Sequence, residues 1–191
     1  MGAPRKEVSP HLWISRWLWT TVRPLRLRSG RLPAPTYCRA VARVLVTGMS
    51  GAGKSTVLAE LHRRGHHTVD TDYHGWVTSD GTWDEQRMDE LLAGRADLVV
   101  SGTVENQGRF YDRFHHVVLL TAPLEVLLAR VRTRAGNPYG KAAEEQDEIA
   151  GYVRTVEPLL RRGATLECDG RRPVAEIADA IEALLGPSAQ R

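Results

Sequence analysis

A glycine-rich segment that ends in lysine and serine constrains the fold of this chain more than any other feature of its sequence. Gly48 and Gly53 are separated by four residues, and Lys54 and Ser55 follow directly. An apolar run over residues 44–47 precedes the segment, and a helical pattern follows it. This is the spacing of a phosphate-binding loop, in which glycines let successive backbone N–H groups point at phosphate oxygens. We therefore expect a strand, a tight loop and a helix whose positive N-terminus faces a bound phosphate.

The residue types in this loop predict how it would bind ATP and Mg²⁺. The Lys54 ammonium would reach the β- and γ-phosphates, and the Ser55 hydroxyl would bind Mg²⁺, with Thr56 as a second local donor. The backbone N–H groups of the loop would surround the phosphates. The expected nucleotide-binding residues of the loop are Gly48, Ser50, Gly51, Ala52, Gly53, Lys54, Ser55 and Thr56.

Short apolar runs alternate with helical patterns from residue 43 onward, which is typical of βα units and a parallel sheet. The expected strands are 44–47, 66–69, 98–101, 117–120 and 164–168. The expected helices are 54–64, 84–94, 123–134, 144–161 and 173–185. The sequence therefore predicts one three-layer α/β/α domain over residues 43–187, with a five-stranded parallel sheet, and a short tail over 188–191.

Two carboxylates follow the second expected strand. Asp70 and Asp72 are two positions apart in an extended segment, so their side chains point the same way, at the edge of the sheet where α/β proteins bind ligands. One carboxylate could hold Mg²⁺ through water, and the other could accept a proton from an attacking hydroxyl. The alternative is a solvated turn, in which aspartate is common.

Arginines gather at the end of the helix expected after the fourth strand. Arg130 and Arg134 are four positions apart and lie on one face of that helix. A Gly/Asn/Pro segment follows, and we expect residues 135–147 to act as a lid that brings positive charge to the migrating phosphoryl group. The alternative is a helix end that carries arginines because they complement the helix dipole.

The acceptor is expected to bind beside the phosphate-binding loop. Residues 73–94 form a short flap, and a polar segment follows the third strand. The expected acceptor-binding residues are Asp72, Trp76, Gly102, Asn106 and Arg109. Trp76 and Trp83 could wall a pocket, or they could be core residues of the flap, and the sequence favours neither interpretation. The segment after the third strand could also be an ordinary connection.

Charge is distributed unevenly along the chain. Of 191 residues, 42% are hydrophobic and 26% charged, which is the composition of a globular protein. Residues 1–42 carry eight basic side chains and one acidic one, whereas the remaining residues carry a net charge of −4. We expect residues 1–42 to be a disordered basic extension, although their Trp and Arg residues would also suit a membrane surface. The acidic remainder argues against nucleic acid as a partner.

Two cysteines cannot form a disulfide framework, and no apolar run is long enough to cross a membrane. We therefore expect a cytoplasmic protein, and a monomer. Adjacent histidines at 66–67 and at 115–116 face opposite sides of a strand, so neither pair predicts a metal site.

Taken together, these features resemble the small P-loop kinases of the nucleoside-monophosphate kinase branch, and within it the shikimate kinase and gluconate kinase group. The resemblance covers about residues 43–186 and implies the strand order 2-3-1-4-5. It implies that Asp70 is the magnesium-associated carboxylate and Asp72 the substrate-facing one. It also implies that Arg130 and Arg134 grip phosphates and that the loop 169–173, which contains Arg172, cradles adenine.

The chain departs from that family on the acceptor side. Shikimate kinases have a run of glycines after the third strand, whereas this chain has a mixed polar segment over residues 101–108. Their acceptor-binding arginine has no clear counterpart in residues 73–77, and the flap is too short for the acceptor domain of adenylate kinases. The acceptor therefore stays open.

The function that the sequence predicts is transfer of the γ-phosphate of ATP·Mg²⁺ to a hydroxyl or phosphate of a small metabolite or nucleotide. Lys54, Asp72, Arg130 and Arg134 are the expected catalytic residues, and Ser55 and Asp70 the expected Mg²⁺ ligands. One alternative is a regulatory P-loop NTPase that acts through a partner, but the third strand ends without the aspartate that such a switch usually has. Another alternative is a kinase of nucleic-acid ends.

Overall fold

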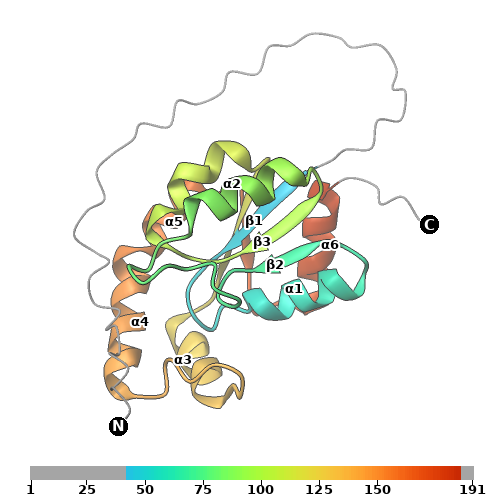
Figure 1. Ribbon diagram of the computed structural model, residues 1–191. Coiled ribbons are helices and arrows are strands. Elements are labelled where there is room, and N and C mark those ends of the chain that lie inside the picture. The colour runs from blue at the N-terminus through green and yellow to red at the C-terminus, as the bar shows by residue number, and fades with distance from the viewer. Residues whose placement is uncertain (1–41, 186–191) are drawn as a thin grey trace.

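Five short strands with apolar centres form one parallel sheet in the computed structural model, which describes residues 42–185 (Figure 1). The strands are β1 (Arg43–Thr47), β2 (Thr68–Asp70), β3 (Leu98–Ser101), β4 (His116–Thr121) and β5 (Leu166–Asp169). They lie in the order β2-β3-β1-β4-β5, and every neighbouring pair is parallel. The predicted fold class and strand order are confirmed. The predicted extension over 1–42 and the tail over 188–191 lie outside the described residues, apart from residue 42.

Helices connect the strands, as the alternating pattern predicts. They are α1 (Lys54–Arg63), α2 (Glu85–Gly94), α3 (Leu124–Thr133), α4 (Ala143–Thr155), α5 (Glu157–Gly163) and α6 (Val174–Leu185). A 3₁₀ helix, η2 (Glu105–Arg113), occupies the polar segment after β3, where no helix was expected. The single helix expected over 144–161 is divided into α4 and α5, because Pro158 cannot donate the hydrogen bond that would continue α4.

The two faces of the sheet carry separate hydrophobic cores, because side chains alternate across a strand. In β1, Val44 and Val46 face a core that α1 and α6 cover, whereas Leu45 faces a second core that α2 and η2 cover. This arrangement is the predicted three-layer architecture. Within residues 42–185, no helix combines the length and apolar character needed to cross a membrane.

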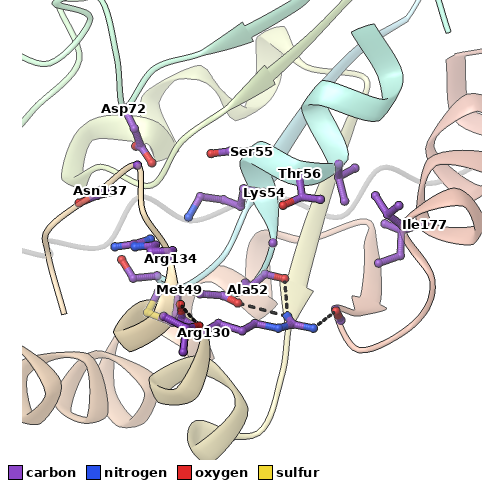
Figure 2. Close-up of a pocket in the computed structure, with 18 of the residues that line it drawn as sticks. Met49, Ala52, Lys54, Ser55, Thr56, Asp72, Arg130, Arg134, Asn137 and Ile177 are labelled. Carbon is purple, nitrogen blue, oxygen red and sulfur yellow. Dashed lines mark hydrogen bonds between the residues drawn. The ribbon is translucent and has the colours of Figure 1, made fainter. Parts of the chain in front are cut away.

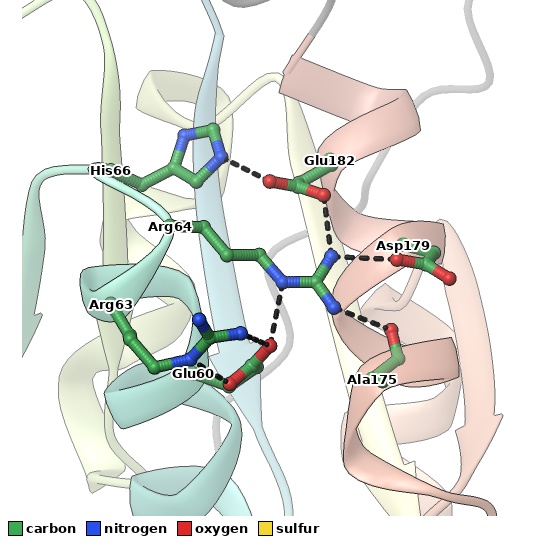
Figure 3. A network of polar contacts seen from close by, with 7 residues as sticks. All are labelled: Glu60, Arg63, Arg64, His66, Ala175, Asp179 and Glu182. Carbon is green, nitrogen blue, oxygen red and sulfur yellow. Dashed lines mark hydrogen bonds and ion pairs between the residues drawn. The ribbon is translucent and has the colours of Figure 1, made fainter.

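A polar network joins the C-terminal end of α1 to α6 (Figure 3). The guanidinium of Arg64 donates to the carboxylates of Glu60, Asp179 and Glu182 at 2.6–2.7 Å. Glu182 also bonds Nε2 of the buried His66 at 2.7 Å. These contacts fix the two helices that cover one face of the sheet.

Because all strands are parallel, their carboxyl ends meet at one edge of the sheet. The phosphate-binding loop follows β1 there, Asp70 ends β2 and Ser101 ends β3. The register pairs Asp70 with Ser101 and Val46 with Ser101, so the three strand ends lie side by side. The fold therefore brings the loop and the paired aspartates together.

Candidate active site

The phosphate-binding loop has a backbone that requires glycine. Gly48 and Gly51 have φ angles of 144° and 87°, which side chains with a Cβ rarely adopt. A Cβ at Gly48 would lie 2.3 Å from the carbonyl oxygen of Leu120, and one at Gly51 would lie 2.5 Å from that of Leu127. The loop therefore packs against the end of β4 and against α3, and α1 begins at its end.

Lys54 lies at the first turn of α1 and is buried. Its Nζ donates a hydrogen bond to the carbonyl oxygen of Gly48 at 2.7 Å. Burial lowers the pKa of Lys54, and the nearby carboxylates of Asp72 and Asp70 oppose that shift. Arg134 also lowers the pKa of Lys54, so these four charged side chains share one electrostatic environment.

Ser55 and Asp70 are in direct contact. The Ser55 hydroxyl donates to Oδ2 of Asp70 at 2.7 Å, and Oδ1 of Asp70 accepts from the backbone N–H of Asp72 at 3.2 Å. Hydroxyl and carboxylate oxygens beside a phosphate-binding loop are the kind of ligand that Mg²⁺ takes in proteins. These residues fit the ion, and they are the two that the sequence predicts. Among residues 42–185, no cluster of three or more His, Cys, Asp or Glu side chains suggests a further metal site.

A cavity of about 600 Å³ lies over the loop (Figure 2). This size is within the range of small-molecule sites. Its lining comes from the loop and α1, the turn after β2, the end of α3 with the segment that follows, and the start of α6. It includes Met49, Ser50, Gly51, Ala52, Gly53, Lys54, Ser55, Thr56, Asp72, Tyr73, Arg130, Arg134, Asn137, Gly170, Arg172 and Ile177. Most of the predicted nucleotide-binding residues and all four predicted catalytic residues therefore line one cavity.

Arg130, in α3, and Arg134, the C-cap of that helix, have different surroundings. The Arg130 guanidinium donates to the carbonyl oxygens of Gly51, Ala52 and Gly170, at 3.2, 3.4 and 2.9 Å (Figure 2). It joins the phosphate-binding loop to the segment after β5. In Arg134, Nη2 donates to the carbonyl oxygen of Tyr139 at 2.7 Å, and the buried Nε has no hydrogen-bond partner within residues 42–185. Arg134 also lines the cavity, so its guanidinium places positive charge beside Lys54 and Asp72.

The segment after α3 is fixed by the first turn of α4. The Glu145 carboxylate accepts from the backbone N–H groups of Gly140, Lys141 and Ala142 at 2.7, 3.0 and 3.2 Å. These hydrogen bonds lower the pKa of Glu145. The carbonyl of Tyr139 that orients Arg134 belongs to the same folded segment.

Four predicted acceptor-binding residues do not line the cavity. Trp76 is buried, and the Arg87 guanidinium covers its ring at 3.9 Å. The Asn106 amide bonds the backbone of Trp83, and Arg109 pairs with Glu85. Gly102 packs against Thr71 and Trp83. These residues have packing and polar partners within the domain. Trp83 is a core residue, which is one of the two interpretations that the sequence left open.

Several residues that line the cavity were not predicted as site residues, and two of them carry polar side chains beside Asp72 and Arg134. Tyr73 directly follows Asp72 and is 42% exposed, while Asn137 lies in the expected lid. The sequence signal for Tyr73 is its position next to Asp72, and the signal for Asn137 is its position in the expected lid over residues 135–147. Asp72 approaches the cavity from the turn after β2, whereas Arg134 and Asn137 approach it from the end of α3 (Figure 2). Tyr73 lines the cavity from the same turn as Asp72.

The fold and the cavity define the class of this protein as a P-loop domain with the fold of small kinases. Solved structures with this fold include a shikimate kinase from Acinetobacter baumannii in complex with shikimate, at 20% identity and a TM-score of 0.59. That match covers 76% of this chain and 93% of the other. A gluconokinase from Sinorhizobium meliloti matches at 20% identity and a TM-score of 0.52, covering 78% and 93% of the two chains. The predicted resemblance is confirmed at the level of the fold.

The model of the AAA domain family matches residues 44–151, more than half of the chain, and the chain belongs to that family. A nucleotide-binding protein from Rhodospirillum rubrum is 29% identical over 159 residues. The match covers 79% of this chain and 49% of the relative, so the chain spans about half the length of that protein.

Proposed function

We propose that this protein transfers the γ-phosphoryl group of ATP to a hydroxyl group of a small molecule. The observation that carries the proposal is the cavity over the phosphate-binding loop, which Lys54, Arg134 and Asp72 line together. Backbone N–H groups for phosphate, two cationic side chains and one carboxylate are the groups that phosphoryl transfer needs. The kinase fold of the structural neighbours supports the same reaction class.

The triphosphate would lie along the loop with its terminal phosphates at the N-terminus of α1. Lys54 would exchange its hydrogen bond with the Gly48 carbonyl for one with a phosphate oxygen. The negative charge of the phosphate would then offset the free-energy cost of burying the Lys54 ammonium. Ser55 and Asp70 would hold Mg²⁺, and the ion when bound neutralises phosphate charge. Arg130 and Arg172 would contact the nucleotide on the far side of the loop.

Asp72 would act as the general base. The acceptor hydroxyl gives its proton to the Asp72 carboxylate while its oxygen forms a bond to the γ-phosphorus. The bond between that phosphorus and the bridging oxygen breaks, and ADP leaves with the negative charge. The guanidinium of Arg134, which lines the cavity, would stabilise the charge on the transferred group.

The acceptor would enter between Tyr73 and Asp72 on one side and Arg134 and Asn137 on the other. The acceptor is expected to be small, since only this part of the cavity is left when a triphosphate occupies the loop. Tyr73 offers an exposed aromatic ring beside the base, which would contact the body of the acceptor.

Two substitutions test the proposal. Lys54→Ala should abolish binding of AMP-PNP with Mg²⁺ in calorimetry, because one buried cation of the phosphate site is lost. Asp72→Asn should bind AMP-PNP as the wild type does but slow phosphorylation of an acceptor found in a metabolite panel by about 10²- to 10⁴-fold. Asp112→Asn, exposed in η2, is the matched control. Full activity of Asp72→Asn would contradict the assigned base.

A further inference from the structure

Thr71 stands between the two carboxylates of the site and is 1% exposed. Its backbone N–H and its hydroxyl both donate to the carbonyl oxygen of Ser101, at 2.9 and 2.8 Å. The turn that carries Asp70 and Asp72 is therefore attached to the end of β3 through Thr71. The Asp70 carboxylate itself bonds the Ser55 hydroxyl and the backbone N–H of Asp72.

The indole of Trp83 completes the hydrogen bonding of this threonine. Nε1 of Trp83 donates to the Thr71 hydroxyl oxygen at 2.9 Å. A hydroxyl has one proton to donate, and here that proton is directed at Ser101, so the oxygen accepts from the indole. The two bonds together leave the Thr71 side chain one rotamer, since a rotation would leave a buried donor unsatisfied.

Trp83 is fixed in turn by burial, by an aromatic contact and by hydrogen bonds to its backbone. It is 1% exposed, and its ring meets Phe110 edge to face with centroids 5.8 Å apart. The Asn106 side chain accepts from the Trp83 backbone N–H at 2.9 Å and donates to its carbonyl at 3.0 Å. The flap is therefore anchored to η2 at the residue whose indole reaches Thr71.

The absence of a side chain at Gly102 leaves room for the contact between the Thr71 hydroxyl and the Trp83 indole. A Cβ at this position would lie 2.0 Å from the Thr71 hydroxyl oxygen and 3.1 Å from Cζ2 of Trp83. Any larger residue would displace the hydrogen bond between them. The contact is thus specified by Thr71, Trp83, Gly102 and Asn106 together, on four separate segments of the chain.

We propose that Trp83 is a positioning residue, which fixes the orientation of Asp70 and Asp72 through Thr71. The inference rests on the proposed function, because those carboxylates would hold Mg²⁺ and accept the proton of the acceptor. Trp83 touches neither ligand and does not line the cavity. Its effect is therefore on the geometry of Asp70 toward Ser55 and of Asp72 toward the acceptor.

The test is the gain in AMP-PNP affinity that excess Mg²⁺ provides, measured by calorimetry in paired titrations with and without the ion. Trp83→Phe keeps an aromatic ring and removes the donor, and Thr71→Val removes the hydroxyl at nearly constant volume. Each should reduce the Mg²⁺-dependent gain roughly fivefold, the size expected for one hydrogen bond. The affinity for AMP-PNP without Mg²⁺ should not change, because the phosphate-binding loop is not involved.

Two matched variants separate positioning from packing. Thr71→Ser retains the hydroxyl and should keep the wild-type gain. Phe110→Leu removes the edge-to-face partner of Trp83 without touching the hydrogen bond, so it should lower the unfolding midpoint and leave the gain unchanged. A wild-type gain in both Trp83→Phe and Thr71→Val would overturn the inference. Wild-type protein that fails to bind AMP-PNP would instead contradict the proposed function.

A measurement on the unaltered protein covers the case in which the variants do not fold. The indole N–H signal of Trp83 can be assigned in ¹H–¹⁵N spectra by its through-space contacts with Phe110. Addition of AMP-PNP and Mg²⁺ should shift this signal more than AMP-PNP alone does, although the indole lies outside the cavity. Equal shifts under the two conditions would overturn the inference.

Discussion

Arg132 and Arg134 are two positions apart, yet only one of them reaches the cavity. Arg134 lines it and has a buried Nε–H without a partner in the described part of the chain. Arg132 is exposed and donates to the side chain of Gln146. The same substitution at Arg132 and at Arg134 therefore removes one guanidinium outside the cavity and one inside it.

We predict that Arg134→Gln slows turnover of ATP by about 10²-fold, the usual effect of removing one donor from a developing negative charge. Water serves as acceptor in this assay until an acceptor is identified. Arg132→Gln should leave turnover within about twofold of the wild type, because its side chain faces solvent. Equal losses in the two variants would show that general positive charge, and not a placed donor, supports the reaction.

Single residues also show why part of the site could be predicted and part could not. The phosphate-binding loop is a local pattern, so Lys54 and Ser55 could be assigned from spacing alone. Asn106 has the side chain of a ligand-binding residue, but its partner is a backbone 23 residues away in the flap. Only the packing of the flap decides that Asn106 is structural and that Tyr73 faces the cavity.

At the level of elements, hydrophobic periodicity predicted the sheet and most helices. The 3₁₀ helix η2 was missed, because its residues are largely polar and show no helical stripe in the sequence. Pro158 is the sequence signal for the division of 144–161, because proline has no N–H to continue the hydrogen bonding of α4. Strand order depends on contacts between distant segments, and only the family resemblance supplied it.

The contact between α1 and α6 gives a prediction about acid stability (Figure 3). Hydrogen bonds from Arg63 and Arg64 lower the pKa of Glu60 to about 2, from an ordinary value of 4.5. Because the pKa is lower in the folded state, the contribution of Glu60 is complete above pH 4.5 and is lost as the pH falls toward 2. We expect Glu60→Gln to be less stable than the wild type at neutral pH, with the difference shrinking below pH 4.5.

Urea unfolding midpoints at a series of pH values between 7 and 2.5 would measure this difference. Glu144→Gln, exposed on α4, is the control and should follow the wild-type curve. A difference between Glu60→Gln and the wild type that stays constant over the whole pH range would show that the Glu60 charge does not stabilise the contact.

At the scale of the whole molecule, charge separates a metabolite kinase from a kinase of nucleic-acid ends. Residues 1–42 carry a charge of +7 and the rest of the chain −4, so the domain that holds the cavity is acidic. A protein that contacts six to ten nucleic-acid phosphates loses about 10³- to 10⁵-fold in affinity between 50 and 200 mM salt. A small acceptor in a cavity of about 600 Å³ makes no comparable set of contacts.

We therefore predict that turnover with a small-molecule acceptor, measured on the full chain, changes less than about threefold between 50 and 200 mM salt. The full chain is needed because its basic N-terminal residues could bind nucleic acid without placing it in the cavity. An oligonucleotide with a free 5′-hydroxyl should not be phosphorylated at either salt concentration. Phosphorylation of the oligonucleotide at 50 mM salt and its loss at 200 mM would contradict the prediction, since that behaviour requires a phosphate-tracking surface leading to Asp72.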